Sequence, residues 1–302
     1  MPKLRDVDVK IVNGLQVDKE NDDVIYNDEK HLYLDKVTGA KYTSVTTLVH
    51  QYTQPFDELW WARYKACEFL LDPEMWKFLK RDLLQTKVWK DSYLEDYDID
   101  PVIFEKKVTE IREGYKKKRE EACERGTRIH AAKEDLYSKP GEIEVNKYGV
   151  GGKFKTNAGN YKINCDRGIF PEFLISYKFD DYLMISGQLD LWILDNNEVT
   201  IVDYKSNAKI ERKSYFDHKT KQSQKMKFPL NNLDDCSWIH YCLQLSVYAY
   251  LLQKINPKFK IKNLIIHHID HDDNETEFIS NLVCYAEAKD ITCKIEDKDW
   301  QD

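Results

Sequence analysis

Glycine and proline are scarce in this sequence of 302 residues, which has 11 glycines and 8 prolines. This scarcity excludes a collagen-like chain, a flexible linker and a proline-rich low-complexity protein. The first ten residues, MPKLRDVDVK, lack an apolar segment and carry acidic residues early. We therefore expect neither a secretory signal nor a transit peptide, and we expect a cytoplasmic protein.

An apolar run of membrane-spanning character is also missing. The longest stretch without a charged residue, 236–253, is interrupted by polar residues that include Ser237, His240 and Gln244. This pattern predicts a buried helix rather than a membrane span, so no membrane partner is expected.

Cysteine pairs with metal-ligand spacing are absent, because the seven cysteines are scattered and none forms a CxxC pair. Their odd number indicates reduced thiols instead of a disulfide framework. We expect neither a structural zinc site nor an iron–sulfur cluster, since both need closely spaced ligands. The GxxxxGK(S/T) loop of ATP-binding proteins is missing as well, so no ATP site is expected.

The net charge of −7 excludes a polycation that coats nucleic acid. Basic residues nevertheless gather in two segments. Residues 205–227 contain eight lysines and arginines, and a second group at 112–128 includes the run KKKR. This distribution is compatible with a basic face on an acidic protein.

The periodicity of the sequence predicts an α/β fold. Short strands are expected within 24–45, and a long charged helix begins at Pro101, where proline fits the first helical turn. Gly114 and Gly126 leave open whether this helix breaks or continues. The remaining expected elements are helices at 44–51, 56–71, 75–95 and 236–254, and the strand-like runs FLISYKF, YLMISGQLDLWIL, VTIVDYKS, NLIIHHID and EFISNLVCY.

We expect a mixed central sheet flanked by helices, with a helical elaboration at the N-terminus. Residues 1–119 would supply the N-terminal strand hairpin and helices, and 120–302 the core, the two together forming one compact unit. A basic insertion spans 207–234, and no element is assigned to 138–168.

A hairpin around Asn196-Asn197 organises the most informative residues. Asparagine tolerates the positive φ that a two-residue turn requires. With the turn at these two residues, Asp190 lies directly opposite Asp203 on one face of the sheet. Lys205 shares this face because it follows Asp203 by two residues, and Gln188 would lie opposite Lys205. A register shifted by one residue would instead separate the two aspartates.

Two opposed carboxylates repel each other unless a cation lies between them. Two oxygen ligands beside a lysine suit a Mg²⁺ site for phosphodiester cleavage. A (D/E)xK triplet alone has little value, because so charged a sequence contains several by chance. The other face of the hairpin should be ordinary core, with Leu189, Leu191, Ile193 and Val202.

Two pairs of residues have the spacing of one helical turn. His130 and Glu134 form one pair in GTRIHAAKEDLY, and Gln244 and Tyr248 form the other in HYCLQLSVYAYLL. The alternative for His130 is a partly buried structural histidine. The alternative for Tyr248 is core packing, with Gln244 filling a polar gap.

The chain contains, in this order, GTRIH with Glu134, GQLD, VDYKS and QLSVY. This series resembles the RecB-like exonucleases of the PD-(D/E)XK superfamily, which include phage, viral and mitochondrial genome maintenance members. The resemblance implies a restriction-endonuclease-like fold with a DNA channel built partly by residues 1–119. It implies that His130, Asp190, Asp203 and the Tyr204 carbonyl hold a metal ion, and that Lys205 is catalytic. It also implies supporting roles for Glu134, Glu172, Gln188, Gln244 and Tyr248, and a phosphate contact for Ser44.

The expected function is therefore that of a Mg²⁺-dependent deoxyribonuclease, with Mn²⁺ able to substitute, which acts as an exonuclease on DNA ends or single strands. Replication or recombination proteins are expected partners. Two alternatives stay open: a structure-selective or nicking endonuclease, and a non-enzymatic DNA-end-binding protein. Trp60 and Trp61 could stack on bases, whereas Trp192 should pack in the core. The residues expected to bind the DNA backbone are Arg128, Lys209, Arg212 and Lys213.

Overall fold

The computed structural model of the chain describes residues 11–12, 15–180, 183–217, 221–280 and 284–293. The chain forms two compact units. We call residues 1–53, 128–215 and 223–302 the sheet unit, and residues 54–127 and 216–222 the helical unit.

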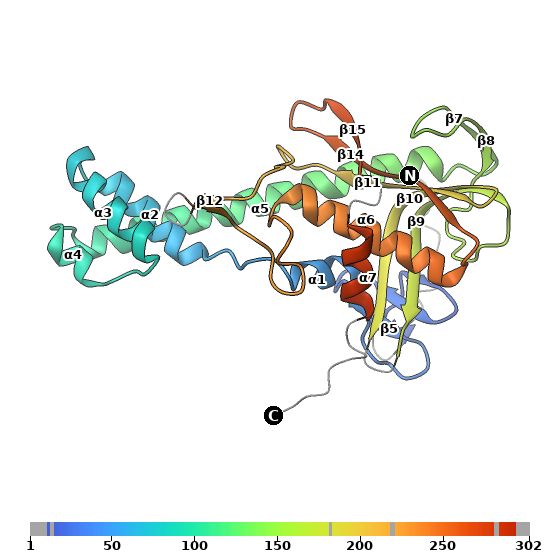
Figure 1. Cartoon of the computed structure of the whole chain (residues 1–302), viewed down its shortest axis with the longest axis horizontal. Coiled ribbons are helices and arrows are strands. Elements are labelled where there is room, and N and C mark those ends of the chain that lie inside the picture. Colours follow the sequence, from blue (N-terminus) through green and yellow to red (C-terminus); the bar gives the residue numbers. More distant parts are fainter. Residues whose placement is uncertain (1–10, 13–14, 181–182, 218–220, 281–283, 294–302) are drawn as a thin grey trace, which may run out of the picture. The chain divides into compact units, whose positions relative to one another are not determined.

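A six-stranded mixed sheet forms the centre of the sheet unit (Figure 1). Its strand order is β15-β14-β11-β10-β6, and β9 also pairs with β10. The β11–β14 and β10–β6 pairs are parallel, and the other pairs are antiparallel. The strands are β6 (Thr43–Ser44), β9 (Arg167–Lys178), β10 (Met184–Asp195), β11 (Glu198–Lys205), β14 (Lys260–Ile269) and β15 (Glu275–Ile279). The expected α/β class with a mixed, helix-flanked sheet is confirmed.

The predicted hairpin register is also confirmed. Asp195 pairs with Glu198 and Leu191 with Val202, and Asn196 has the positive φ of 50° that the tight turn requires. The paired region begins at Leu191 and Val202, one step from Asp190 and Asp203, so the expected opposition of the two aspartates stays a prediction.

One edge of β10 changes its partner beside Asp190. From Leu191 onward this edge pairs with β11, whereas Ile185 and Ser186 pair with β6. The two partner strands diverge between these points, so residues 187–190 lie at an opening in the sheet. Gln188 therefore does not pair with Lys205 as expected; across the other edge it pairs with Leu174 of β9.

The alternation of side chains along β10 shifts at the same place. Leu191, Ile193 and Val202 share one core cluster as expected, but Leu189 belongs to the core on the opposite face. The expectation for Leu189 was wrong, because strict alternation assumes a regular strand. At this irregularity Asp190 belongs to neither of the two hydrophobic clusters.

Helices cover both faces of the sheet. On one face α1 (Val45–His50), α6 (Ser237–Ile255) and α7 (Tyr285–Cys293) pack around the fully buried Trp192. On the other face lie the C-terminal turns of α5 (Pro101–Tyr137) and the hairpin of β7 (Glu142–Val145) and β8 (Gly152–Lys155). Helix α6 confirms the buried helix expected at 236–254. None of the described helices is long and apolar enough to span a membrane.

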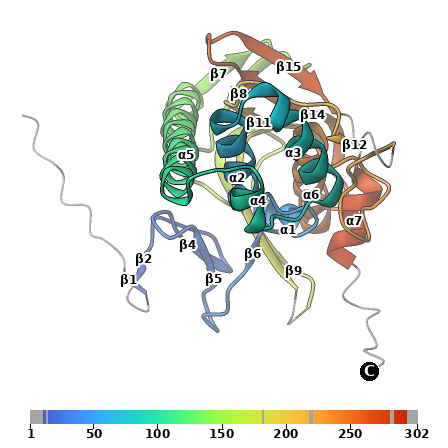
Figure 2. The same cartoon turned by 90° about the vertical axis from the view of Figure 1, so that its left-hand side faces the viewer.

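The other described strands form small separate sheets. The predicted N-terminal hairpin is present as β4 (Val24–Asn27) and β5 (Leu32–Asp35), which Figure 2 shows together with β6 and β9. The hairpin of β7 and β8 lies within 138–168, where no element was expected. The remaining strands are β1 (Ile11–Val12), β2 (Leu15–Gln16), β3 (Lys19–Glu20), β12 (Phe216–Asp217) and β13 (Gln222–Ser223).

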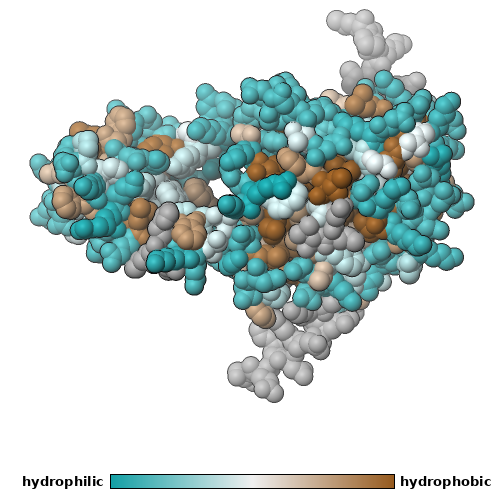
Figure 3. Space-filling model, turned by 45° about the horizontal axis from the view of Figure 1, so that its top comes forward, coloured by the Kyte–Doolittle hydropathy of each residue, from teal (hydrophilic) through white to brown (hydrophobic). Residues whose placement is uncertain are grey.

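The helical unit has its own aromatic core. It contains α2 (Glu58–Leu70), α3 (Pro73–Thr86), α4 (Ser92–Asp96) and the first part of α5. Trp60 is only 8% exposed and packs with Trp76 and Phe104, which leaves little of its ring for base stacking. Figure 3 shows hydrophobic residues among hydrophilic ones over this unit, at the left of the view.

Helix α5 continues through Gly114 and Gly126 without a break. The boundary expected after residue 119 therefore falls inside a helix. The two compact units divide the chain differently, because β6 pairs with β10 and so places the N-terminal strands in the sheet unit.

Candidate metal centre

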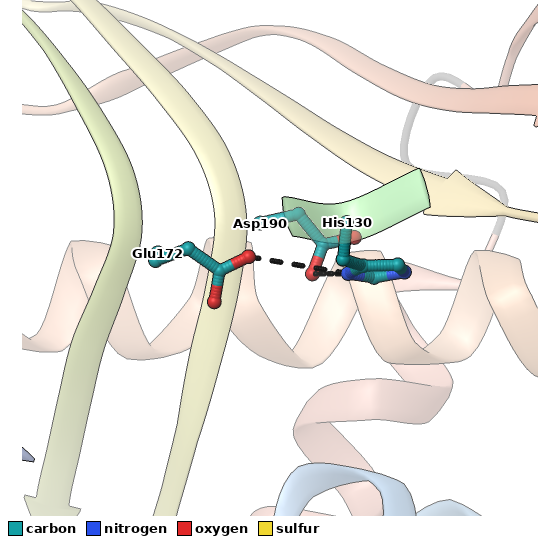
Figure 4. Close-up of side chains that lie close together, drawn as sticks. All are labelled: His130, Glu172 and Asp190. Atoms are coloured by element: carbon teal, nitrogen blue, oxygen red, sulfur yellow. Dashed lines mark ion pairs between the residues drawn. The ribbon is translucent and has the colours of Figure 1, made fainter. Parts of the chain in front are cut away.

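His130, Glu172 and Asp190 form a close cluster in the sheet unit. Each offers one ligand atom, and these atoms lie within 4.8 Å of one another. His130 Nδ1 lies 3.3 Å from Asp190 Oδ1 and 3.9 Å from Glu172 Oε1. Figure 4 shows the three side chains pointing toward one another from α5, β9 and β10.

Strand pairing brings the two carboxylates together. Pro171 pairs with Leu191 and Phe173 with Leu189, so Glu172 lies across from Asp190. Glu172 has a φ of 47°, a conformation that residues other than glycine adopt rarely. This strained backbone occurs where the alternation of β9 and β10 shifts, and strain of this kind often marks a functional site.

The backbone of Tyr204 contacts two members of the cluster. Its N–H donates to Asp190 Oδ2 at 2.7 Å, and its carbonyl oxygen lies 3.2 Å from His130 Nε2. The carbonyl thus lies beside the cluster, where the sequence resemblance implied a ligand. The Tyr204 backbone therefore fixes Asp190 through its N–H and offers its carbonyl oxygen as a further ligand atom.

Asp203 and Lys205 form a buried ion pair next to this cluster. Lys205 Nζ lies 2.6 Å from Asp203 Oδ2, and the Asp203 side chain is only 5% exposed. Gln244 of α6 donates from Nε2 to Asp203 Oδ1 at 3.0 Å. Lys205 Nζ also lies 4.9 Å from the centre of the Tyr241 ring. The close three-residue cluster does not include Asp203, which faces α6.

The electrostatics of the carboxylates differ according to their neighbours. Burial alone would raise the pKa of Asp190, but His130, Lys205 and the Tyr204 N–H hold it below its usual value. Burial, followed by the charge of Asp190, raises the pKa of Glu172 to about 7. Burial and the charge of Asp190 raise the pKa of Asp203 to about 6, although Lys205 opposes the shift. The carboxyl groups of Glu172 and Asp203 thus resist ionisation unless a cation lies beside them.

The charge of His130 follows from the same carboxylates. Burial lowers the pKa of this imidazole, but Asp190, Asp203 and Glu172 outweigh burial and raise it to about 9. In the absence of a metal ion the protonated ring therefore supplies part of the missing positive charge. A divalent cation would replace that proton, because a histidine ligand must be neutral.

The supporting residues lie around the centre. The Tyr248 hydroxyl donates to the Gln188 carbonyl oxygen at 2.9 Å, so α6 contacts β10 at the opening of the sheet. Glu134 is half-buried on α5, and its charge contributes to the raised pKa of Glu172. Ser44 caps α1, since its Oγ accepts a hydrogen bond from the Thr47 N–H at 3.0 Å.

The residues expected to bind DNA do not share one arrangement. Arg128 and Lys213 are exposed, and Lys209 pairs with Glu211 at 3.0 Å. The Arg212 guanidinium lies 4.3 Å from the centre of the Trp238 ring. Their contacts with DNA stay a prediction.

Sequence reasoning missed one group beside the centre and one histidine on α6. Lys19 Nζ lies 3.4 Å from Glu172 Oε2, a contact that links β3 to β9 and has no local sequence signal. His240 lies four residues before Gln244, and its spacing could have extended the Gln244–Tyr248 pair by one helical turn.

No family model and no curated protein matches this sequence. Among solved structures, SSO0001 is similar to the chain, with 16% identity and a TM-score of 0.23 over 41% of this chain and 48% of the other. A protein named "Putative exonuclease" from Eubacterium rectale is similar too, with 14% identity and a TM-score of 0.28 over 42% of each chain. The chain thus spans less than half the length of either neighbour, and likenesses this slight carry no argument about function.

Proposed function

We propose that this protein is a metal-dependent deoxyribonuclease of the RecB-like type, which acts as an exonuclease on DNA ends or single strands. The observation that carries the proposal is the arrangement around Tyr204. Its backbone contacts both Asp190 and His130, while the adjacent residues Asp203 and Lys205 form a buried ion pair. Acids, an imidazole and a lysine therefore meet at one opening of the sheet.

The donor set fits a hard divalent cation. Carboxylate and carbonyl oxygens with one imidazole suit Mg²⁺ and Mn²⁺. His130, Asp190 and Glu172 would hold the ion together with the Tyr204 carbonyl. Asp203 would join them by exchanging its present contact with Lys205 or Gln244 for the ion. When bound, such an ion acidifies water and stabilises the charge that develops on a phosphate.

The protein's own groups would orient the reaction. Gln244 holds one oxygen of Asp203, so the other faces Lys205. Lys205 would stabilise negative charge on the phosphate or orient the attacking water. Retention of both acids and the lysine favours an enzyme over a non-enzymatic DNA-end-binding protein.

The test is a time course with end-labelled linear DNA and closed circular single-stranded DNA, with and without Mg²⁺. We expect cleavage of linear DNA that EDTA abolishes and that rising salt weakens, because phosphate contacts release counterions. Persistent cleavage in EDTA would contradict the metal assignment. Efficient cutting of the circle would indicate an endonuclease instead.

A further inference from the structure

A second polar cluster lies at the N-terminal end of α6, outside the metal centre. His240 Nε2 lies 2.6 Å from Asp235 Oδ1, and the Asp235 side chain is only 4% exposed. Gln224 donates from Nε2 to the other oxygen, Asp235 Oδ2, at 3.1 Å. A buried carboxylate held from both sides therefore fixes the orientation of one imidazole.

His240 lies in line with two α6 residues that contact the candidate site. His240, Gln244 and Tyr248 follow one another at intervals of four residues, so they share one face of α6. Gln244 contacts Asp203 and Tyr248 contacts β10. His240 thus continues the same row by one turn, and its neighbour Tyr241 lies beside Lys205.

A second imidazole comes from α1. The rings of His50 and His240 lie 6.5 Å apart, edge to face. His50 is exposed and His240 is half-buried, so a ligand can reach both. Lys227 also reaches the end of α1, where its N–H donates to the Tyr52 carbonyl at 2.7 Å and its Nζ to the Gln51 carbonyl at 3.4 Å.

The carboxylate among these groups, Asp235, pairs with His240 and is only 4% exposed, so it is not available to His50 or Lys227 at the surface. Partial burial lowers the pKa of His50, and the charges of His240 and Lys205 lower it further. Like charges that come from separate elements are unfavourable unless an anion joins them. A metal ion is the weaker explanation, because two lysines lie nearby and both oxygens of Asp235 already have partners.

We propose that His50 and His240 bind a phosphate group of the nucleic acid strand, next to the phosphate that is cleaved. Asp235 accepts the hydrogen bond from His240 Nε2, so Nδ1 donates to the phosphate oxygen when the ring is the doubly protonated imidazolium. The proposal rests on the proposed nuclease function for its ligand. The phosphate could be a terminal monoester or an internal diester of the strand.

Binding of single-stranded oligonucleotides by the purified full chain tests the subsite, with Ca²⁺ in place of Mg²⁺ to slow cleavage. We expect His240→Ala and His50→Ala each to raise Kd by about five- to tenfold, as loss of a charge-assisted contact does. Asp235→Asn keeps the imidazole but weakens its orientation, so a smaller loss is expected. His271→Ala, which removes an exposed histidine in the same unit, is the matched control and should bind like the wild type.

Modified strands identify the phosphate. Oligonucleotides with a 5′-phosphate are compared with 5′-hydroxyl strands, and single methylphosphonates replace each internal phosphate in turn. One of these changes should weaken wild-type binding yet have little further effect in His240→Ala, because the two partners of a contact are coupled. The terminal or internal position of that change names the source of the phosphate.

The outcomes separate this subsite from the nuclease proposal. If the wild type cleaves DNA but both histidine variants bind and cleave as it does, the subsite is wrong and the nuclease stands. If the wild type cleaves nothing yet both variants lose strand binding, the subsite stands and the nuclease is wrong. Should His240→Ala fail to melt cooperatively, the exposed His50→Ala variant decides the question.

Discussion

Lys205 has the role that the geometry defines most sharply. It pairs with Asp203 at 2.6 Å, and its charge also lowers the pKa of Asp190. A lysine placed between metal ligands and substrate contributes mainly in the transition state. We expect Lys205→Ala to keep DNA affinity within a few-fold and to lower the cleavage rate by at least about a hundredfold.

Single-turnover rates and strand binding in Ca²⁺ measure the two effects separately. Lys258→Ala is the matched control, because Lys258 is exposed in the same unit and no contact with DNA is expected for it. Cleavage by Lys205→Ala at the wild-type rate would remove this residue from the catalytic machinery.

Glu172 makes the metal-free protein sensitive to pH. Its pKa in the folded protein, about 7, lies above the usual value of 4.5. The folded state therefore favours the protonated carboxyl, and its contribution to stability is present below pH 4.5 and is lost as pH rises through 7. We expect Glu172→Gln to reduce the fall in melting temperature between pH 5 and 8 by a few degrees, since about 1 kcal/mol corresponds to roughly 2–4 °C.

Melting in EDTA at several pH values checks this expectation, with the exposed Glu142→Gln as control. Asp203 titrates near pH 6 in the same direction, so part of the pH dependence should remain. An unchanged pH profile in Glu172→Gln would show that Glu172 is ionised in the folded protein.

Part of the geometry around the candidate site could be predicted because its signals are local. A two-residue turn sets the register of β10 and β11 from Asp195 and Glu198 to Leu191 and Val202, and helical spacing pairs Gln244 with Tyr248. The left-handed backbone of Glu172 and the shifted side of Leu189 could not be predicted. Both depend on how β9 pairs with β10, a contact that no local pattern records.

At the scale of elements, Gly187 allows α6 to approach β10 closely. A Cβ at this position would lie 2.8 Å from Tyr248 Cε1 and 3.1 Å from Val45 Cγ2. We expect Gly187→Ala to destabilise the protein by about 1–3 kcal/mol, as overpacking of a core does. Because Tyr248 must move, its contact with the Gln188 carbonyl and the cleavage rate should decline together.

Denaturant unfolding and a double variant test this packing. In a Tyr248→Ala background Gly187→Ala should cost less stability than in the wild type, because the ring that an alanine at 187 would strike is gone. Gly114→Ala is a control of opposite sign: Gly114 lies in α5 with open space around it, so alanine should stabilise by about 0.5–1 kcal/mol. Equal stability of Gly187→Ala and the wild type would contradict the close approach.

The sequence predicted long elements better than short ones. The helix expected at 236–254 is α6 (Ser237–Ile255), because its buried side chains form a continuous pattern. The hairpin of β7 and β8 was missed, because each strand has four residues and gains its core contacts from Val145 and Phe154 against the sheet. Those contacts join segments that are distant in sequence.

At the scale of the whole molecule, the division into units could not be predicted from contiguous segments. The strands before α1 join the sheet unit through pairing of β6 with β10, and α5 belongs to both units. The candidate metal ligands nevertheless all belong to one unit. His130, Glu172, Asp190 and Asp203 lie in the sheet unit.

This distribution predicts where a metal ion stabilises the protein. A ligand stabilises the folded state that holds its site, by an amount that grows with its concentration relative to Kd. Local opening differs among segments of one protein. In hydrogen–deuterium exchange, Mg²⁺ should therefore slow exchange in β9, β10 and β11, whereas α2 and α3 of the helical unit should exchange as before.

An oligonucleotide added in Ca²⁺ should additionally protect the helical unit if its helices help to form the DNA channel. Asp190→Asn should lose the Mg²⁺ effect, and equal protection of α2 and β10 by Mg²⁺ alone would place the metal site elsewhere.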